Sequence, residues 1–168
     1  MRLGWRTVFG DIPGRLRAEL PAELHDFRWN FSGIQAKASF GNRLLHYEIW
    51  VRPRLGVVEL GLHFEEDALT NARLYGAFRS RAKEVKRALG ADARIEEWDR
   101  GWCRVWEPIR LEPVDEAFAE RIRSRFVEYV RALEPILREE LPKDVEWTVA
   151  KPKRAARGSY SRASRSAR

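Results

Sequence analysis

The sequence contains little cysteine and no long apolar run. Its single cysteine, Cys103, excludes an internal disulfide and a zinc site built from several cysteines, which fits a reducing compartment. No stretch of about 18 apolar residues is present to span a bilayer, and residues 1–6 lack the apolar segment of a secretion signal. These absences predict a cytoplasmic protein without membrane contact, whose core is held by packing alone.

Motifs of the common enzyme classes are also missing. The chain has no glycine-rich phosphate loop, no dinucleotide fingerprint and no serine nucleophile elbow. No cofactor is therefore predicted, and an enzyme is the less favoured interpretation. Cys103 falls on the core side of its predicted strand, which indicates a buried, inert thiol and not a nucleophile.

Length and composition predict one folded domain. A chain of 168 residues, 44% of them hydrophobic, is large enough for one core and too small for two full domains. We assign residues 1–150 to this domain. Residues 151–168 hold no large apolar residue except Tyr160, so we predict that this segment is a disordered basic tail.

The net charge of +7 belongs to that tail. The tail holds seven of the 32 basic residues and no acidic residue, which leaves 25 basic and 25 acidic residues in 1–150. A polycation is attracted to phosphate through counterion release, so the tail predicts non-specific nucleic-acid binding. The alternative is a solubilising terminus without a partner. The seven cations are Lys151, Lys153, Arg154, Arg157, Arg162, Arg165 and Arg168.

Alternation of apolar and polar residues predicts strands in the first half of the chain. The period-two pattern begins at Arg28 and runs to residue 40, before a turn at Gly41-Asn42. Further strands are predicted over 44–51 and 57–64, with a turn at 52–54 between them. We expect these two strands to form a hairpin.

Apolar residues three and four positions apart predict helices elsewhere. Leucines four apart predict a helix over 13–27, which Pro21 kinks or divides. A second helix is predicted over 69–89, and a third, long one over 114–137. Residues 5–9 are a candidate short strand.

The order of these elements predicts the fold class. Strands joined by tight turns pair antiparallel, and helices with one apolar stripe must cover the single apolar face of the strands. The sequence therefore predicts an α+β fold, a two-layer sandwich with a mainly antiparallel sheet of five or six strands and the helices on one face.

A second hairpin is predicted over 94–106. Its three-residue loop, Asp99-Arg100-Gly101, gives the glycine the left-handed position and fixes the register. The pairs expected across the two strands are Trp98 with Trp102, Glu96 with Arg104, and Arg94 with Trp106.

Tryptophan and arginine are expected to gather on the sheet face away from the helices. Aromatic rings interleaved with guanidinium groups could stack on nucleic-acid bases or another planar ligand, or become buried in a homodimer or against a protein partner. The alternative is that residues 1–12 or the segment after Pro135 cover the face. This ligand or partner face comprises Trp50, Arg94, Trp98, Trp102, Arg104 and Trp106.

Two histidines and two glutamates are predicted on the same face of neighbouring strands. His46, Glu48, Glu59 and His63 could meet as a two-histidine, two-carboxylate metal site. A two-residue turn would place Glu48 opposite Glu59, whereas a register two residues away would place His46 opposite His63. The favoured alternative is a solvated polar face, because no short metal-binding motif is present.

Part of the chain carries a recognisable sequence pattern. The segments FRSRAKEVKRALG at 78–90 and RIEEW at 94–98 are followed by a strand and a long helix. With these segments, the stretch 28–137 resembles an uncharacterised prokaryotic α+β domain family, whose members occur alone or attached to restriction-like nuclease modules. The resemblance implies an accessory role near nucleic acid. It supplies no catalytic signature and no functional residues, and the nuclease module is not visible in this chain.

The sequence therefore leaves three hypotheses for the function of the protein. The leading hypothesis is a non-catalytic accessory module that associates with nucleic acid through the basic tail and the tryptophan face. The second is a protein-interaction or homodimerisation domain. The third is a metal-dependent enzyme that uses the histidine and glutamate cluster.

Overall fold

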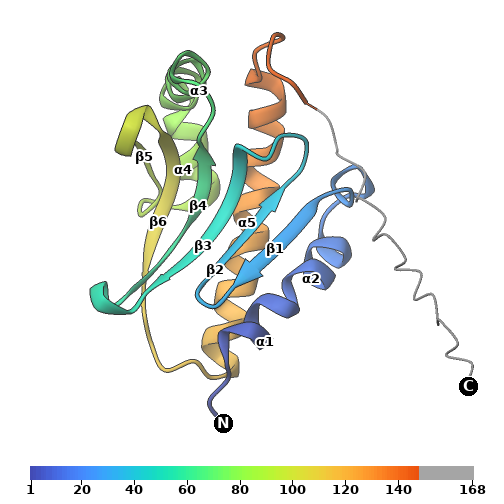
Figure 1. Ribbon diagram of the computed structural model, residues 1–168, viewed down its shortest axis with the longest axis vertical. Coiled ribbons are helices and arrows are strands. Elements are labelled where there is room, and N and C mark those ends of the chain that lie inside the picture. The colour runs from blue at the N-terminus through green and yellow to red at the C-terminus, as the bar shows by residue number, and fades with distance from the viewer. Residues whose placement is uncertain (148–168) are drawn as a thin grey trace, which may run out of the picture.

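The chain folds into a six-stranded sheet backed by helices, as the computed structural model shows for residues 1–147 (Figure 1). All neighbouring strands are antiparallel, which confirms the predicted α+β class. The tail cations, from Lys151 onward, lie outside the described residues. In sheet order the strands are β1 (Arg28–Ser32), β2 (Gln35–Ser39), β3 (Leu45–Arg52), β4 (Val57–Phe64), β6 (Cys103–Arg110) and β5 (Arg94–Glu97).

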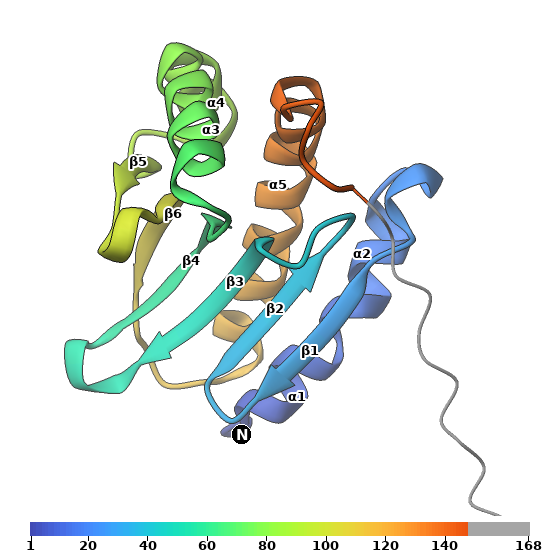
Figure 2. The same cartoon turned by 45° about the horizontal axis from the view of Figure 1, so that its top comes forward.

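The helices cover one face of this sheet (Figures 1 and 2). The long α5 crosses behind the central strands, with α1 and α2 on the β1 side and α3 and α4 on the β5 side. Within residues 1–147, none of the helices has the length and apolar character needed to cross a bilayer. The helices are α1 (Trp5–Gly10), α2 (Ile12–Glu19), α3 (Ala68–Ser80), α4 (Ala82–Leu89) and α5 (Glu116–Glu140).

The hydrophobic core lies between the helices and the sheet. Alternate residues of β3 and β4 face it, as the period-two pattern predicts. These buried residues are Leu45, Tyr47, Ile49, Val51, Val58, Leu60, Leu62 and Phe64. From α5, Phe126 packs edge-on against Trp29 and Tyr47. Cys103 is buried in the same core.

The N-terminal residues are helical. The candidate strand at 5–9 belongs to α1, and that interpretation is wrong because burial here follows the spacing of a helix and does not alternate. The buried residues are Val8, Phe9, Ile12 and Leu16. Pro21 divides the helix predicted over 13–27, since α2 ends before it and a separate 3₁₀ turn, Ala22–Leu24, follows it.

Two other predicted elements are each divided in the structure. Residues 28–40 form a hairpin, because Gly33 adopts a φ of 48° and turns the chain between β1 and β2. The helix predicted over 69–89 breaks at Arg81, whose φ of −100° and ψ of 17° depart from helical values, and so becomes α3 and α4.

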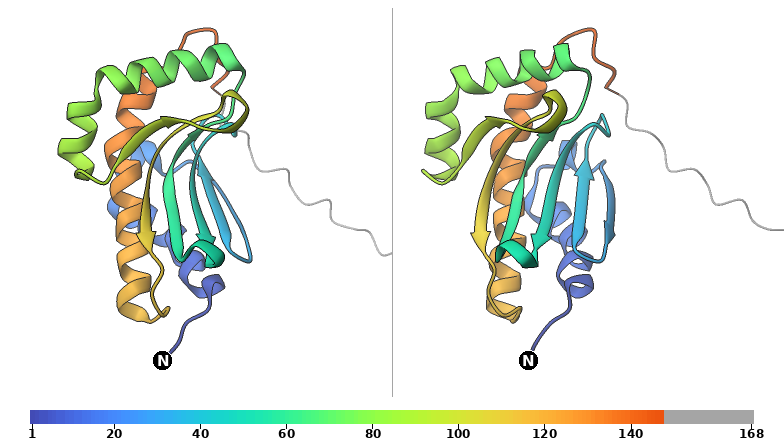
Figure 3. Two further views of the ribbon diagram at one scale, coloured as in Figure 1. Left: turned by 90° about the vertical axis from the view of Figure 1, so that its left-hand side faces the viewer. Right: turned by 60° about the vertical axis from the view of Figure 1, so that its left-hand side comes forward.

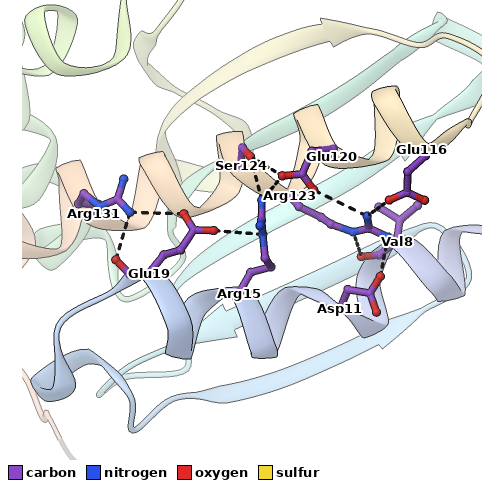
Figure 4. Close-up of polar contacts among 9 residues, drawn as sticks. All are labelled: Val8, Asp11, Arg15, Glu19, Glu116, Glu120, Arg123, Ser124 and Arg131. Atoms are coloured by element: carbon purple, nitrogen blue, oxygen red, sulfur yellow. Dashed lines mark hydrogen bonds and ion pairs between the residues drawn. The ribbon is translucent and has the colours of Figure 1, made fainter.

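A buried arginine ties the N-terminal helices to α5 (Figure 4). Arg123 is 4% exposed and donates to Asp11 at 2.6 Å, to Glu116 at 2.8 Å and to the carbonyl of Val8 at 3.4 Å. Arg15 of α2 pairs with Glu120 of α5 in the same row of contacts. These contacts hold α1 and α2 on the helical side of the sheet, away from its opposite face.

Candidate metal centre

The sheet face opposite the helices carries a dense group of polar side chains. Figure 3 shows this face without a covering helix, and the β5–β6 hairpin bends toward it. Its residues are nevertheless buried: His46 is 2% exposed, and Glu48 and His63 are each 3% exposed. The side chains of this open face therefore bury one another.

The register between β3 and β4 decides which of these side chains meet. The turn takes four residues, 53–56, because a 3₁₀ turn is closed by a left-handed glycine. His46 therefore lies directly opposite His63. The predicted alternative of a two-residue turn, which would place Glu48 opposite Glu59, is therefore wrong.

The pairing assembles two imidazoles and two carboxylates. One ligand atom from each of His46, Glu48, His63 and Glu65 lies within 4.8 Å of the other three. The Nε2 atom of His46 is 3.3 Å from Glu48 Oε2 and 3.8 Å from Glu65 Oε1. His63 Nδ1 is 3.7 Å from the same Glu65 oxygen. Four donor atoms thus converge on one point.

A backbone contact orients His46. Its Nδ1 atom lies 3.1 Å from the carbonyl oxygen of Arg43. Because a carbonyl can only accept, Nδ1 donates a proton to it, and the other ring nitrogen, Nε2, faces the carboxylate of Glu48, where a metal ion would take the place of the Nε2 proton. A backbone acceptor of this kind is the usual orienting partner of a metal-binding histidine.

His63 presents a buried nitrogen without a partner. Among residues 1–147, its Nδ1 atom makes no hydrogen bond, since Glu65 lies 3.7 Å away, beyond hydrogen-bonding range. The ring is held in place by stacking on His46, at 5.6 Å, and by edge contact with Trp98, at 5.4 Å. The cluster therefore contains a rigidly held nitrogen, His63 Nδ1, that has no hydrogen-bond partner among residues 1–147.

The ionisable groups of the cluster favour the protonation states that bind metal. Burial opposes ionisation of Glu48, but the contacts with His46, His63 and Lys37 outweigh it and hold the pKa of Glu48 below its usual value. Burial is likewise outweighed at Glu65, chiefly by His63, and its pKa is lowered. Burial lowers the pKa of His63 itself, favouring the neutral ring. Ionised carboxylates and neutral imidazoles are the forms that ligate metals.

Two side chains of β2 border the cluster. Lys37 lies opposite Glu48 in the sheet, with its Nζ 2.9 Å from Glu48 Oε2. Gln35 donates its amide to the other oxygen of Glu48 at 2.9 Å. Glu48 is therefore oriented by Gln35 and Lys37, and the Lys37 cation already neutralises part of its charge.

Glu59 lies outside this cluster. The sequence-based ligand set included it, but in the structure it is opposite Trp50 and accepts from Arg104 at 3.1 Å and Arg52 at 3.3 Å. Glu65 takes its place. Glu65 follows the end of β4 and shares the strand parity of His63, which is the signal that sequence analysis could have used.

The tryptophan face is largely filled by its own side chains. The guanidinium of Arg104 lies between two rings, 3.7 Å from the centre of Trp106 and 4.7 Å from that of Trp98. It also donates to Glu96 at 2.8 and 3.0 Å. The cross-strand pairs expected for this hairpin are confirmed for Arg94 with Trp106 and for Glu96 with Arg104.

Among residues 1–147, neither residues 1–12 nor the segment after Pro135 is seen to cover this face. Residues 1–12 pack against α5 on the other side of the sheet. After α5, Trp147 packs on Gly41 at the edge of the β2–β3 connection. Trp50, Trp98 and Trp102 remain partly exposed, so their proposed role in contacting a ligand or partner stays a prediction.

Comparisons of this chain with known protein families, with curated proteins and with solved structures give no match.

Proposed function

We propose that the protein binds a divalent transition-metal ion on the open face of its sheet. The ligands are His46 Nε2, His63 Nδ1 and one carboxylate oxygen each from Glu48 and Glu65. The observation that carries the proposal is the convergence of these four atoms within 4.8 Å around a buried nitrogen that lacks a partner among residues 1–147. An unsatisfied buried polar atom is costly, and a metal ion would satisfy it.

The donor atoms indicate the class of ion. Imidazole suits zinc, cobalt, iron and nickel, whereas magnesium and calcium take oxygen ligands almost alone. Bonds of about 2.1 Å in a tetrahedral zinc site place neighbouring ligands roughly 3.4 Å apart. The separations of 3.3, 3.7 and 3.8 Å are close to that value. The ligand atoms lie up to 4.8 Å apart, so a first-row ion such as Zn²⁺ or Co²⁺ would draw the widest pair together by roughly 1.4 Å.

The test compares two glutamates of the same face. Co²⁺ and Zn²⁺ affinities are measured for the wild type, Glu65→Gln and Glu59→Gln by the visible absorption of Co²⁺ and its displacement by Zn²⁺. We expect Glu65→Gln to weaken binding at least about tenfold, since losing a group that only hydrogen-bonds to a metal ligand already costs about 10- to 100-fold in metal affinity. Glu59→Gln, outside the cluster, should change affinity less than about twofold. Equal effects of the two substitutions would reject the site.

The basic C-terminal segment supports a second proposed function, association with nucleic acid. Residues 151–168 contain seven cations and no anion beside a formally neutral 1–150. About seven phosphate contacts imply that affinity falls roughly a thousandfold between 50 and 200 mM salt. Binding of a labelled oligonucleotide that is insensitive to salt would contradict this role.

The single buried Cys103 supports a reducing compartment such as the cytoplasm.

A further inference from the structure

The proposed metal centre keeps one side open to solvent. Zinc can expand from four ligands to five, and iron centres built from two histidines and a carboxylate keep positions free for further ligands. The side chains of His46, Glu48 and His63 are only 3–4% exposed, whereas that of Glu65 is 16% exposed. A further ligand can therefore reach the ion beside Glu65.

Apolar side chains flank this open side. The backbone N–H of Glu65 donates to the carbonyl of Leu44 at 2.8 Å, so the pairing of β3 with β4 continues past the strand ends. Because side chains alternate along a strand, Leu44 lies on the same face as His46, and it is 46% exposed. Next to this pair, the partly exposed ring of Trp98 meets His63 edge-on at 5.4 Å. A ligand of the ion would therefore find apolar surface beside it.

The charge of the loaded site favours a ligand with one negative charge. Glu48 and Glu65 together neutralise a divalent ion, and Lys37, whose Nζ lies 2.9 Å from Glu48 Oε2, adds one positive charge. Its side chain is 31% exposed, and an ammonium group has three donors, so Lys37 can donate to a ligand as well as to Glu48. A carboxylate neutralises this remaining charge, whereas a phosphate dianion would leave the site negative.

We propose that the metal centre binds the carboxylate of a small organic acid that has an apolar body. This inference rests on the proposed metal site. One carboxylate oxygen ligates the ion and the other accepts a hydrogen bond from Lys37, while the apolar body lies against Leu44 and Trp98. An acid with such a body fits the site better than a fully polar anion, because it removes the apolar surface of these two side chains from water.

The experiment uses full-length protein loaded with Co²⁺, whose visible absorption reports a change of ligands. Acetate, benzoate and benzamide are titrated separately, because acetate lacks the ring of benzoate and benzamide lacks its charge. We expect both carboxylates to shift the Co²⁺ spectrum, with benzoate acting at about a tenfold lower concentration, since part of its ring is removed from water. Benzamide should leave the spectrum unchanged at the concentration that saturates the response to benzoate.

Two leucine variants locate the apolar contact. Leu44→Ala shortens the side chain beside Glu65 and keeps the backbone carbonyl to which Glu65 donates. Leu55→Ala is the matched control, because Leu55 is 61% exposed and lies in the turn at the opposite end of the β3–β4 hairpin. The quantity compared is the ratio of the acetate and benzoate concentrations required at saturating Co²⁺, in which a change of metal affinity cancels. We expect Leu44→Ala to lower this ratio about threefold and Leu55→Ala to keep the wild-type ratio.

A third variant tests the contact with Lys37. Lys37 also orients Glu48, so the response to acetate is compared with the response to imidazole, a neutral ligand of the same open position, at saturating Co²⁺. We expect Lys37→Gln to shift the preference about tenfold from acetate toward imidazole, because the cation that accepts the second carboxylate oxygen as a partner is lost. An unchanged preference would reject the proposed placement of the carboxylate.

The outcomes distinguish the metal site from its ligand. If no Co²⁺ spectrum of a bound ion appears, the metal site itself is rejected, and this inference is rejected with it. If Co²⁺ binds but neither acetate nor benzoate alters its spectrum, the metal site stands and the organic-acid ligand is rejected. Equal responses to acetate and benzoate would reject the apolar body, and a response to benzamide equal to that to benzoate would reject recognition of a carboxylate.

Discussion

The two faces of the sheet bury their side chains in opposite ways. On the helical side, apolar residues of β3 and β4 are covered by α5, and burying each large one contributes about 1.5–3 kcal/mol. On the open face none of the helices within residues 1–147 lies over the strands, yet His46, Glu48 and Arg104 are 2%, 3% and 6% exposed. There, charged and aromatic side chains cover one another through ion pairs and ring contacts.

This difference bears on which buried side chains are needed for the stability of the fold. Buried charges must be paired, and even a paired set is often no more stabilising than apolar residues of the same volume. We infer that the histidines and carboxylates of the open face are present for binding, because their contribution to stability gives no reason to prefer them.

The largest effect is expected on the helical face. Phe126 of α5 is fully buried and touches the rings of Trp29 and Tyr47. Phe126→Ala removes a large apolar group and leaves a cavity, so the free energy of unfolding in urea should fall by about 3–5 kcal/mol. A loss under 1 kcal/mol would show that α5 is not packed on the sheet as described.

A smaller effect is expected from breaking the charge pairing of the open face. Arg104→Met leaves Glu59, which is 8% exposed, with Arg52 as its remaining partner among residues 1–147. We expect the free energy of unfolding to fall by about 2 kcal/mol, because an incompletely paired carboxylate remains buried. Adding Glu59→Gln should recover part of this loss. If the double variant is less stable than the single one, mutual pairing does not explain the burial of this face.

The alternation of apolar residues was sufficient to predict the helical face. Because β-strand side chains alternate, the residues of β3 and β4 that enter the core could be assigned without knowing their partners. Breaks within elements could not be assigned in this way. The helix break at Arg81 depends on backbone angles that leave the hydrophobic pattern intact, and a period of four continues through it.

The candidate metal site depended on register, which alternation does not fix. A change of two residues leaves every side chain on its own face and changes every partner. The four-residue turn at 53–56 therefore decided that His46 meets His63 and that Glu59 is excluded. Glu65 and Lys37 were not predicted as members, because one lies beyond the strand end and the other lies on β2. Their proximity is a property of the folded sheet.

A loss of stability smaller than that of Arg104→Met is expected from breaking a polar contact within the apolar core. Tyr47 donates its hydroxyl to buried Glu134 at 3.0 Å, and Arg138 donates to the other oxygen. Burial raises the pKa of Glu134 despite these donors. Tyr47→Phe removes one donor and should lower the free energy of unfolding by about 1 kcal/mol at pH 7.

The pH dependence of this loss and the matched variant Tyr129→Phe test whether the loss comes from the bond between Tyr47 and Glu134. A raised pKa means that the folded protein prefers protonated Glu134, so its contribution to stability is full in acid and declines as pH rises through that pKa. The cost of Tyr47→Phe should therefore be smaller at pH 4 than at pH 7. Tyr129 is also fully buried, but its hydroxyl has no partner among residues 1–147. Tyr129→Phe should cost little at either pH, and equal losses for the two variants would show that the bond to Glu134 is unimportant.

The last prediction requires no substitution: the reactivity of Cys103 tests whether the helical face is closed to solvent. Burial, and then the charge of Glu97, raises the pKa of this thiol to about 11 from 9.0. At pH 8 roughly one thiol in ten is ionised in the unfolded chain and about one in a thousand in the folded protein, so alkylation by iodoacetamide should be about a hundredfold slower in the folded state. Steric protection would slow it further.

Metal loading on the opposite face should leave this rate unchanged, since the sheet separates the two groups. A folded-state rate equal to that of the urea-unfolded protein would mean that this edge of the core opens readily, and the helical face would not be closed to solvent there.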